Sequence, residues 1–150
     1  MPIKIEDISI EYLDRLYEIE IKCFKKEAFT KQQIAQLLQN SNTIGLVAKE
    51  YGEIIGFIIG VLSVEDNIIV GHILTIDVSP NYRRRGVGIR LLQEIEGIFK
   101  NKQANLCRLE VKEDNVAALN LYRKLGYKKL KKLEHYYGDT HGILLEKSLL

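Results

Sequence analysis

Residues 83–88, which read RRRGVG, carry the clearest chemical signature in the chain. An amphipathic helix is predicted to begin at about Val87, and the first turn of a helix presents unpaired backbone N–H groups and a partial positive charge. Glycines there let a phosphate group approach the N–H groups without meeting a Cβ atom, and arginines can pair with its oxygens. The segment therefore indicates a phosphate site. The candidate binding residues are Arg83, Arg84, Arg85, Gly86, Val87 and Gly88.

A plain structural interpretation of this segment stays open. The chain has no GxxxxGK[ST] motif, and its two glycines are not followed by the third glycine of a dinucleotide-binding fingerprint. The glycines could also do no more than shape a tight turn between a strand and a helix, with the arginines as a solvated patch. The segment taken alone favours neither interpretation.

The elements that must position this segment follow from hydrophobic periodicity. Ser9, Thr30 and Asn115 are expected to cap helices at their N-termini, and Gly126 is expected to end the last helix. The order β-α-α-β-β-β-α-β-α-β-β predicts an α+β domain over residues 1–150, with a mixed, mostly antiparallel sheet of about seven strands flanked by four helices. The predicted strands are residues 2–8, 43–50, 54–64, 68–78, 105–111, 127–136 and 143–149, and the predicted helices are residues 10–24, 31–39, 87–100 and 116–125.

In this context the pattern Arg83-x-x-Gly86-x-Gly88 resembles the pyrophosphate loop of the GNAT acetyltransferase superfamily, which binds acyl-coenzyme A. A second family-like segment, LEVKEDNVAALNLYRKLGYKK, begins at Leu109, and the element order matches over essentially the whole chain. The resemblance implies a GNAT fold and acetyl-CoA as co-substrate, with no metal. It also implies that the loop amides hold the pyrophosphate, while the preceding strand pairs with the pantetheine through residues Ile76, Asp77 and Val78.

The resemblance also supplies catalytic candidates. In the branch that acetylates protein N-termini, a glutamate that matches Glu110 is often the base, and a tyrosine that matches Tyr122 lies near the coenzyme sulfur as general acid. Related enzymes place a His or Tyr at the position of His72, and Asn115 matches a residue that commonly contacts the coenzyme. The implied reaction is direct attack in a ternary complex. A module that binds the coenzyme without catalysis is the alternative from another class of function. Each residue has a structural alternative: a core tyrosine, a solvent-facing strand glutamate and an uninvolved histidine.

The amine that accepts the acetyl group is predicted from the free energy of its deprotonation and from two further segments. At pH 7, deprotonation costs about 1 kcal/mol for an α-amine and about 4.6 kcal/mol for lysine, which favours a protein N-terminus over a lysine or a polyamine. Tyr136 and Tyr137 resemble the paired tyrosines of a hairpin that folds over the peptide, although an ordinary aromatic strand end looks the same. The segment of residues 24–29 lacks the proline common in this branch. Glu27 and Phe29 are its candidate substrate contacts.

Composition and short patterns argue against several other classes of function. The 22 basic and 20 acidic residues give a net charge of +2, which is too even to indicate a nucleic-acid binder. Residues 54–64, the most apolar stretch, are too few to cross a bilayer, and no signal peptide is visible. Cys23 and Cys107 are expected to be reduced thiols, and the scattered His135 and His141 do not suggest a metal site. We therefore expect a cytoplasmic monomer or weak homodimer that binds neither nucleic acid nor membrane.

Overall fold

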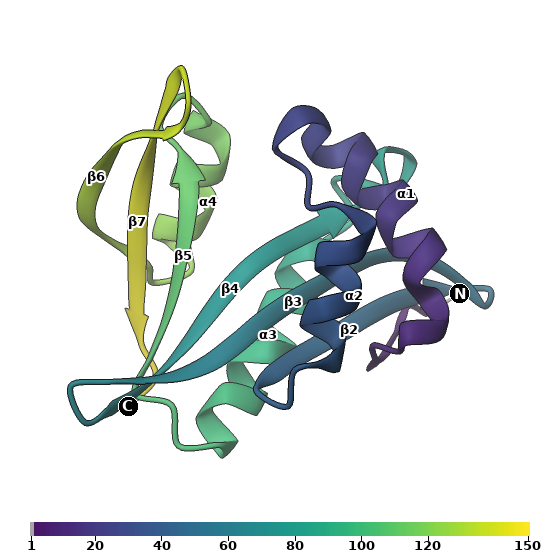
Figure 1. Ribbon diagram of the computed structural model, residues 1–150, viewed down its shortest axis with the longest axis horizontal. Coiled ribbons are helices and arrows are strands. Elements are labelled where there is room, and N and C mark those ends of the chain that lie inside the picture. The colour runs from purple at the N-terminus through teal and green to yellow at the C-terminus, as the bar shows by residue number, and fades with distance from the viewer. Residues whose placement is uncertain (1) are drawn as a thin grey trace.

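The computed structural model describes residues 2–150, and its helices and strands follow the predicted order (Figure 1). Short 3-10 turns, which the periodicity did not predict, occur at Ile10–Tyr12, Lys25–Glu27 and Pro80–Tyr82. No helix in this part of the chain is long and apolar enough to cross a membrane. The strands are β1 (Lys4–Asp7), β2 (Thr43–Glu50), β3 (Glu53–Glu65), β4 (Ile68–Val78), β5 (Leu106–Lys112), β6 (Lys128–Tyr137) and β7 (Thr140–Ser148), and the α-helices are α1 (Leu13–Phe24), α2 (Lys31–Gln39), α3 (Val87–Asn101) and α4 (Val116–Lys124).

Local sequence signals explain where several helices begin. Thr30 caps α2 in a reciprocal capping box with Gln33, and the Asn115 side chain accepts the Ala118 N–H at the start of α4. Gly126 follows α4 with a positive φ of 100°, the conformation expected of a glycine after a helix. The predicted caps of α2 and α4 are therefore confirmed.

The strands form one sheet in the order β1-β2-β3-β4-β5-β7-β6. Its β4–β5 pair is parallel and the other described pairs are antiparallel. Helices α1 and α2 cover one face over a cluster around Leu16, Ile34 and Phe57. Helix α3 covers the opposite face, and side chains of α4 pack against the same cluster as α3 (Figure 1). The predicted α+β class is confirmed.

Strands β4 and β5 pair only briefly. Within the described residues their pairing comprises three rungs and ends at His72 and Arg108. Leu74 then interrupts the register between β3 and β4, because Gly60 pairs with Ile73 while the preceding residue of β3 pairs with Thr75. Such a bulge inserts an extra residue and bends the strand. Beyond it β4 and β5 diverge as the two arms of a V (Figure 1).

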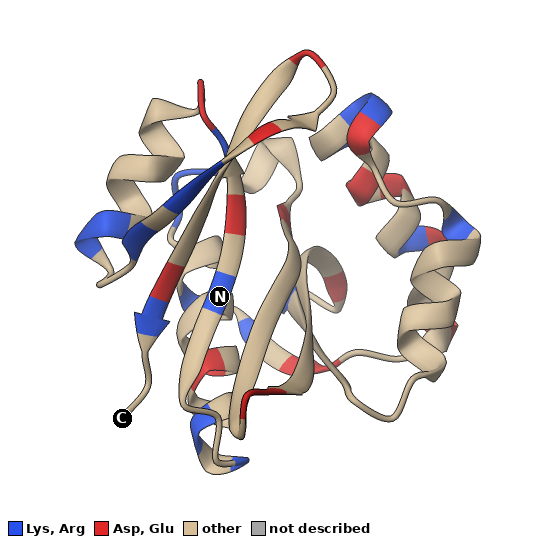
Figure 2. Ribbon diagram, turned by 60° about the vertical axis from the view of Figure 1, so that its left-hand side comes forward, with Lys and Arg blue, Asp and Glu red and all other residues tan. Residues whose placement is uncertain are grey.

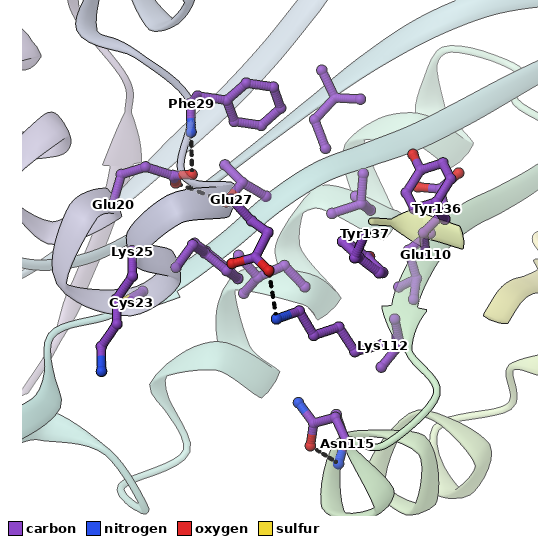
Figure 3. A pocket seen from close by; sticks show the side chains of 18 of the residues that line it. Glu20, Cys23, Lys25, Glu27, Phe29, Glu110, Lys112, Asn115, Tyr136 and Tyr137 are labelled. Carbon is purple, nitrogen blue, oxygen red and sulfur yellow. Dashed lines mark hydrogen bonds and ion pairs between the residues drawn. The ribbon is translucent and has the colours of Figure 1, made fainter. Parts of the chain in front are cut away.

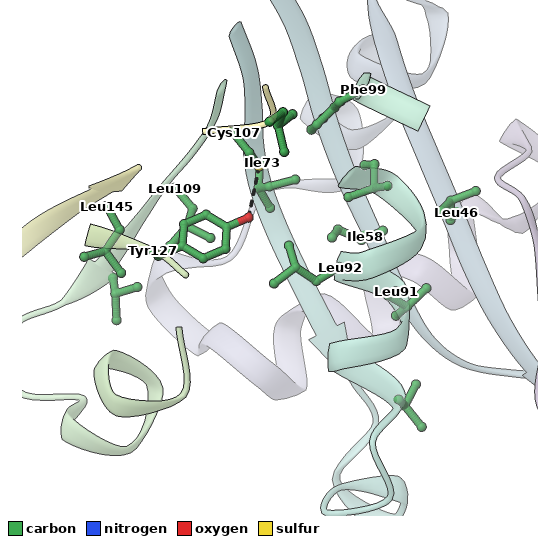
Figure 4. Packing of buried hydrophobic residues seen from close by; sticks show 14 of the residues in the cluster. Leu46, Ile58, Ile73, Leu91, Leu92, Phe99, Cys107, Leu109, Tyr127 and Leu145 are labelled. Carbon is green, nitrogen blue, oxygen red and sulfur yellow. Dashed lines mark hydrogen bonds between the residues drawn. The ribbon is translucent and has the colours of Figure 1, made fainter. Parts of the chain in front are cut away.

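The root of the V is held by very close packing of α3 against the sheet. The ring of Phe99 is fully buried and lies against Gly60 and Gly71, where β3 and β4 pass beneath the helix. A Cβ atom on Gly71 would come within 2.3 Å of that ring. Figure 4 shows Phe99 at one end of the apolar cluster that α3 shares with the sheet. The absence of a side chain at Gly71 is therefore a packing requirement.

We predict that Gly71→Ala lowers the free energy of unfolding by about 1–3 kcal/mol, because the added methyl group overpacks the Phe99 site. Gly97→Ala is the matched control. Gly97 lies inside α3, with no described atom within 4 Å of its Cβ position, so this change should stabilise the protein by about 1 kcal/mol. Urea denaturation measures both. A Gly71→Ala variant as stable as the parent would contradict the packing account.

Candidate active site

The space between the diverging strands is a cleft of about 1040 Å³. Residues 73–76 of β4 form one wall and residues 109–112 of β5 form the other. The segment between α1 and α2, the first turns of α4 and the paired tyrosines complete the lining (Figure 3). The predicted site residues Glu27, Phe29, Ile76, Glu110, Asn115, Tyr122, Tyr136 and Tyr137 all line this cleft.

The wall formed by β4 offers an open backbone edge. Apart from the bulged Leu74, residues 73–78 pair with β3 on one side. Beyond His72 they have no described partner on the side of β5. An unpaired strand edge presents N–H and C=O groups that another extended chain can pair with. Ile76 and Val78 pack toward the α3 cluster, whereas Asp77 is fully buried. At Asp77, therefore, the backbone rather than the side chain is available to a ligand.

The predicted phosphate segment joins the end of β4 to the start of α3. Gly86 is the N-cap of α3 with a φ of +78°, and no side chain caps the helix there. The backbone N–H groups of the first turn are therefore free to face an anion. A Cβ atom on Gly88 would meet only ordinary van der Waals contacts, the nearest at 3.6 Å.

Two of the three arginines of this segment already have protein partners. The Arg83 Nε donates to the Val78 carbonyl at 3.2 Å. The Arg85 guanidinium pairs with Glu50, and this carboxylate raises the pKa of Arg85. Arg84 stands between them with a positive φ of 65°. The uncapped helix N-terminus, rather than a cluster of three free guanidinium groups, is thus the feature of this segment that best suits an anion.

Glu110 and His72 meet where the V begins to open. The His72 Nε2 lies 2.8 and 2.9 Å from the two Glu110 carboxylate oxygens, and the two side chains are 27% and 14% exposed. Glu110 lines the cleft, whereas His72 is not among the lining residues. The imidazole therefore contacts Glu110 from the closed end of the V and fixes the direction of its carboxylate.

Tyr122 approaches the cleft from α4. Its ring packs edge-to-face against Tyr127 with centroids 5.8 Å apart, and burial raises the pKa of Tyr122 to about 12. Its hydroxyl has no hydrogen-bond partner among the described residues. Tyr122 is thus held in its protonated form at neutral pH, with its donor proton available to a group in the cleft.

The two tyrosines that are predicted to contact the peptide lie at the end of β6, near Glu110. Tyr136 and Tyr137 contact one another edge-to-face at 4.9 Å, and Figure 3 shows them beside Glu110. Burial raises the pKa of both hydroxyl groups, and the negative charge of Glu110 raises them further. Both rings therefore stand at the end of the cleft where Glu110 lies.

A salt bridge that sequence reasoning missed crosses the mouth of the cleft. The Lys112 Nζ, at the end of β5, lies 2.8 Å from the Glu27 carboxylate of the α1–α2 segment. Lys112 lowers the pKa of Glu27, and its ammonium also stands 5.7 Å from the centre of the Tyr137 ring. Figure 2 shows acidic and basic residues interspersed over the described chain. Glu27 is therefore an ionised carboxylate whose charge is balanced by Lys112, rather than a free acidic contact.

A buried acidic cluster at the β4 wall of the cleft was also missed. The Thr75 hydroxyl lies 2.9 Å from Glu20 and 2.6 Å from Asp77, and the second Glu20 oxygen accepts the Phe29 N–H at 3.0 Å. Burial and the nearby Glu20 raise the pKa of Asp77 well above its usual range. The cluster anchors the α1–α2 segment to β4. The two-residue alternation in the sequence TIDV was its only signal.

Comparison with known proteins identifies the family. The model of the acetyltransferase (GNAT) family matches residues 13–127. The chain belongs to this family. With it, the predicted GNAT fold and acetyl-CoA-dependent acetyltransferase activity are confirmed.

Individual relatives of this GNAT acetyltransferase point the same way. An N-alpha-acetyltransferase of Sulfurisphaera tokodaii is 36% identical over 62% of the chain, and the match spans 61% of that protein. A putative [ribosomal protein bS18]-alanine N-acetyltransferase of Bacillus subtilis is 29% identical over 91% of the chain and 87% of its own length. The structure of Ard1 from Thermoplasma volcanium superposes with a TM-score of 0.87 at 25% identity, covering 100% of this chain and 99% of that one.

We predict that Asp77→Asn raises the melting temperature of the acetyltransferase at pH 8 by a few degrees. A carboxyl group whose pKa is raised in the folded state favours folding while it is protonated, and that contribution is lost as pH rises from about 4 through the raised pKa. Asparagine does not ionise, so its advantage should shrink towards pH 4.

Thermal unfolding from pH 4 to pH 8 measures this effect, with the exposed Asp7→Asn as control. The control should show no comparable gain. An Asp77→Asn variant that is destabilised equally at both pH values would contradict the raised pKa.

Proposed function

We propose that this GNAT acetyltransferase transfers the acetyl group of acetyl-CoA to the α-amine of a protein N-terminus. One observation carries the proposal: the open edge of β4 lines one side of a cleft, and Glu110, Tyr122 and the paired tyrosines line the other. Residues 83–88 do not line this cleft, but they follow β4 in the chain and lead into the uncapped N-terminus of α3. The names of the relatives, which include N-alpha-acetyltransferase, support this choice of acceptor. A cytoplasmic location, a monomeric or weakly dimeric state and the one-domain extent of residues 1–150 stay predictions, as does the expectation that the protein binds neither nucleic acid nor membrane.

The residues present fit acetyl-CoA. The free N–H groups at the start of α3 suit a pyrophosphate, with Arg84 beside them. The open edge of β4 at residues 76–78 suits the amide groups of a pantetheine arm. Acetyl-CoA supplies an acyl thioester when bound. Asn115 lines the same cleft, but its side-chain oxygen is already used to cap α4.

Glu110 is the proposed base for the amine. Its carboxylate takes a proton from the α-ammonium, directly or through one water, which leaves the neutral amine free to attack the thioester carbon. His72 contacts both carboxylate oxygens and thereby fixes the orientation of the carboxylate. Because an α-amine has a pKa of about 7.7–8.0, a single carboxylate is sufficient for this step at neutral pH.

Tyr122 is the proposed donor to the sulfur that leaves. Burial keeps its hydroxyl protonated, so it can give its proton to the thiolate as the C–S bond breaks. The second proton that the amine nitrogen loses on becoming an amide then restores the hydroxyl. Cys107 takes no part, because it is buried and burial raises its pKa to about 12. The reaction then needs no covalent intermediate on the protein.

The charge balance at the acceptor end argues against a polyamine. A polyamine site needs uncompensated carboxylates, but Glu27 is paired with Lys112 across the cleft, and Lys25 and Lys26 also line it. A second ammonium group would therefore find little negative charge to contact. A peptide carries one ammonium group at its N-terminus and suits this balance better.

Turnover with acetyl-CoA against a panel of acceptors tests the proposal. Short peptides with free N-termini should release coenzyme thiol. The same peptides with a blocked N-terminus and an internal lysine should not, and neither should spermidine. Turnover on lysine or spermidine alone would keep the enzyme class and overturn the acceptor.

We predict that Tyr122→Phe lowers kcat about 10²-fold, the lower end of general acid–base effects. The KM for acetyl-CoA should stay within about twofold, because the ring packing against Tyr127 is retained. Glu110→Gln should lower kcat by a similar factor, with the loss partly recovered at high pH, where the free amine is already neutral. Full activity of Tyr122→Phe would rule out its role as donor.

A further inference from the structure

The β6–β7 hairpin departs from regular pairing where it carries the two cleft tyrosines. After a first bulge at Leu130, pairing continues from Lys131 to Leu133 and resumes only at Tyr137, so residues 134–136 of β6 lie opposite a single residue of β7, His141. Extra residues on one strand bend it away from its partner, and β6 curves visibly beside β7 (Figure 1). The place of both tyrosines thus depends on how this bulge is held.

A hydrogen bond from the backbone to a side chain holds the bulge. His135 has a φ of +54°, a left-handed conformation that is uncommon for a residue other than glycine. Its N–H donates to the Nδ1 of His141 at 2.8 Å, and its own Nδ1 lies 3.2 Å from the Gly138 carbonyl. The two imidazole rings pack edge-to-face with centroids 4.8 Å apart. Because the Nδ1 of His141 accepts, the ring must carry its proton on Nε2.

His141 is itself fixed to the strand that carries Glu110. Its carbonyl accepts the Glu113 N–H at 2.9 Å, just after the end of β5. The next residue, Gly142, leaves room for Tyr136, since a Cβ atom there would lie 3.1 Å from the Cβ of that tyrosine. His141 therefore links the bulge that carries the tyrosines to the end of β5.

We infer that His141 is a positioning residue: through Tyr136 and Tyr137 it helps to position the peptide that accepts the acetyl group. Its Nδ1 holds His135 in the left-handed conformation that places Tyr136 and Tyr137 at the Glu110 end of the cleft. Without the Nδ1 of His141, the His135 N–H loses its hydrogen-bond partner. The backbone of His135 can then relax to a negative φ, which turns the two tyrosines that follow. The inference rests on the proposed function, because it concerns how the peptide is bound.

Two variants of nearly equal size separate the hydrogen bond from simple packing. His141→Asn places an amide oxygen where the Nδ1 stands, whereas His141→Leu has a similar shape and no acceptor. We expect His141→Leu to raise the KM for the peptide about tenfold, the size expected for one lost hydrogen bond. Its kcat and its KM for acetyl-CoA should stay near the parent values, and His141→Asn should behave like the parent throughout.

The ¹H–¹⁵N spectrum gives a readout that does not depend on activity. The His135 amide should stay protected from hydrogen exchange in His141→Asn and lose that protection in His141→Leu. Equal rises in peptide KM for the two variants, or no rise in either, would overturn the inference while the proposed function stands. A parent enzyme that acetylates no peptide N-terminus would overturn the proposed function, and the inference with it.

Discussion

The site depends on the brief pairing between β4 and β5. Two parallel strands that stayed paired would bury their facing edges and leave no space for a substrate. Here the pairing ends at His72 and Arg108, and the bulge at Leu74 bends β4 away. This arrangement leaves the edge of β4 open beyond His72. The close packing of Phe99 against Gly60 and Gly71 holds the strands together at the root of the V, so the open edge is limited to one end of the sheet. The cleft therefore follows from the way in which the strands of the sheet pair.

The same divergence separates the part of the site that suits the coenzyme from the part that carries Glu110. The β4 arm leads to the N-terminus of α3, where free N–H groups suit an anion, and the β5 arm carries Glu110. His72 lies on the last rung that the strands share, so it reaches Glu110 across the point of divergence. The Glu27–Lys112 pair joins the β5 arm to the segment between α1 and α2 at the mouth. The proposed reaction therefore brings donor and acceptor to one place from opposite sides.

Local patterns in the sequence were sufficient to predict the elements and the loop at residues 83–88, because periodicity, caps and glycines act over a few residues. Contacts that depend on tertiary placement were not predictable in the same way. Alternation separates the faces of Asp77 and Val78, but it does not reveal that α1 brings Glu20 to the former. His135 and His141 looked scattered, yet the hairpin bulge makes them neighbours.

The most direct test of the central claim is the binding of a conjugate that joins the CoA sulfur to the α-amine of a peptide through an acetyl group. A cleft that holds both substrates for direct transfer should bind this conjugate at least about 10²-fold more tightly than CoA, as expected for mimics of a transition state. The same peptide joined through a lysine should gain far less. Calorimetry that finds no gain for the α-linked conjugate, or an equal gain for the lysine-linked one, would contradict the account.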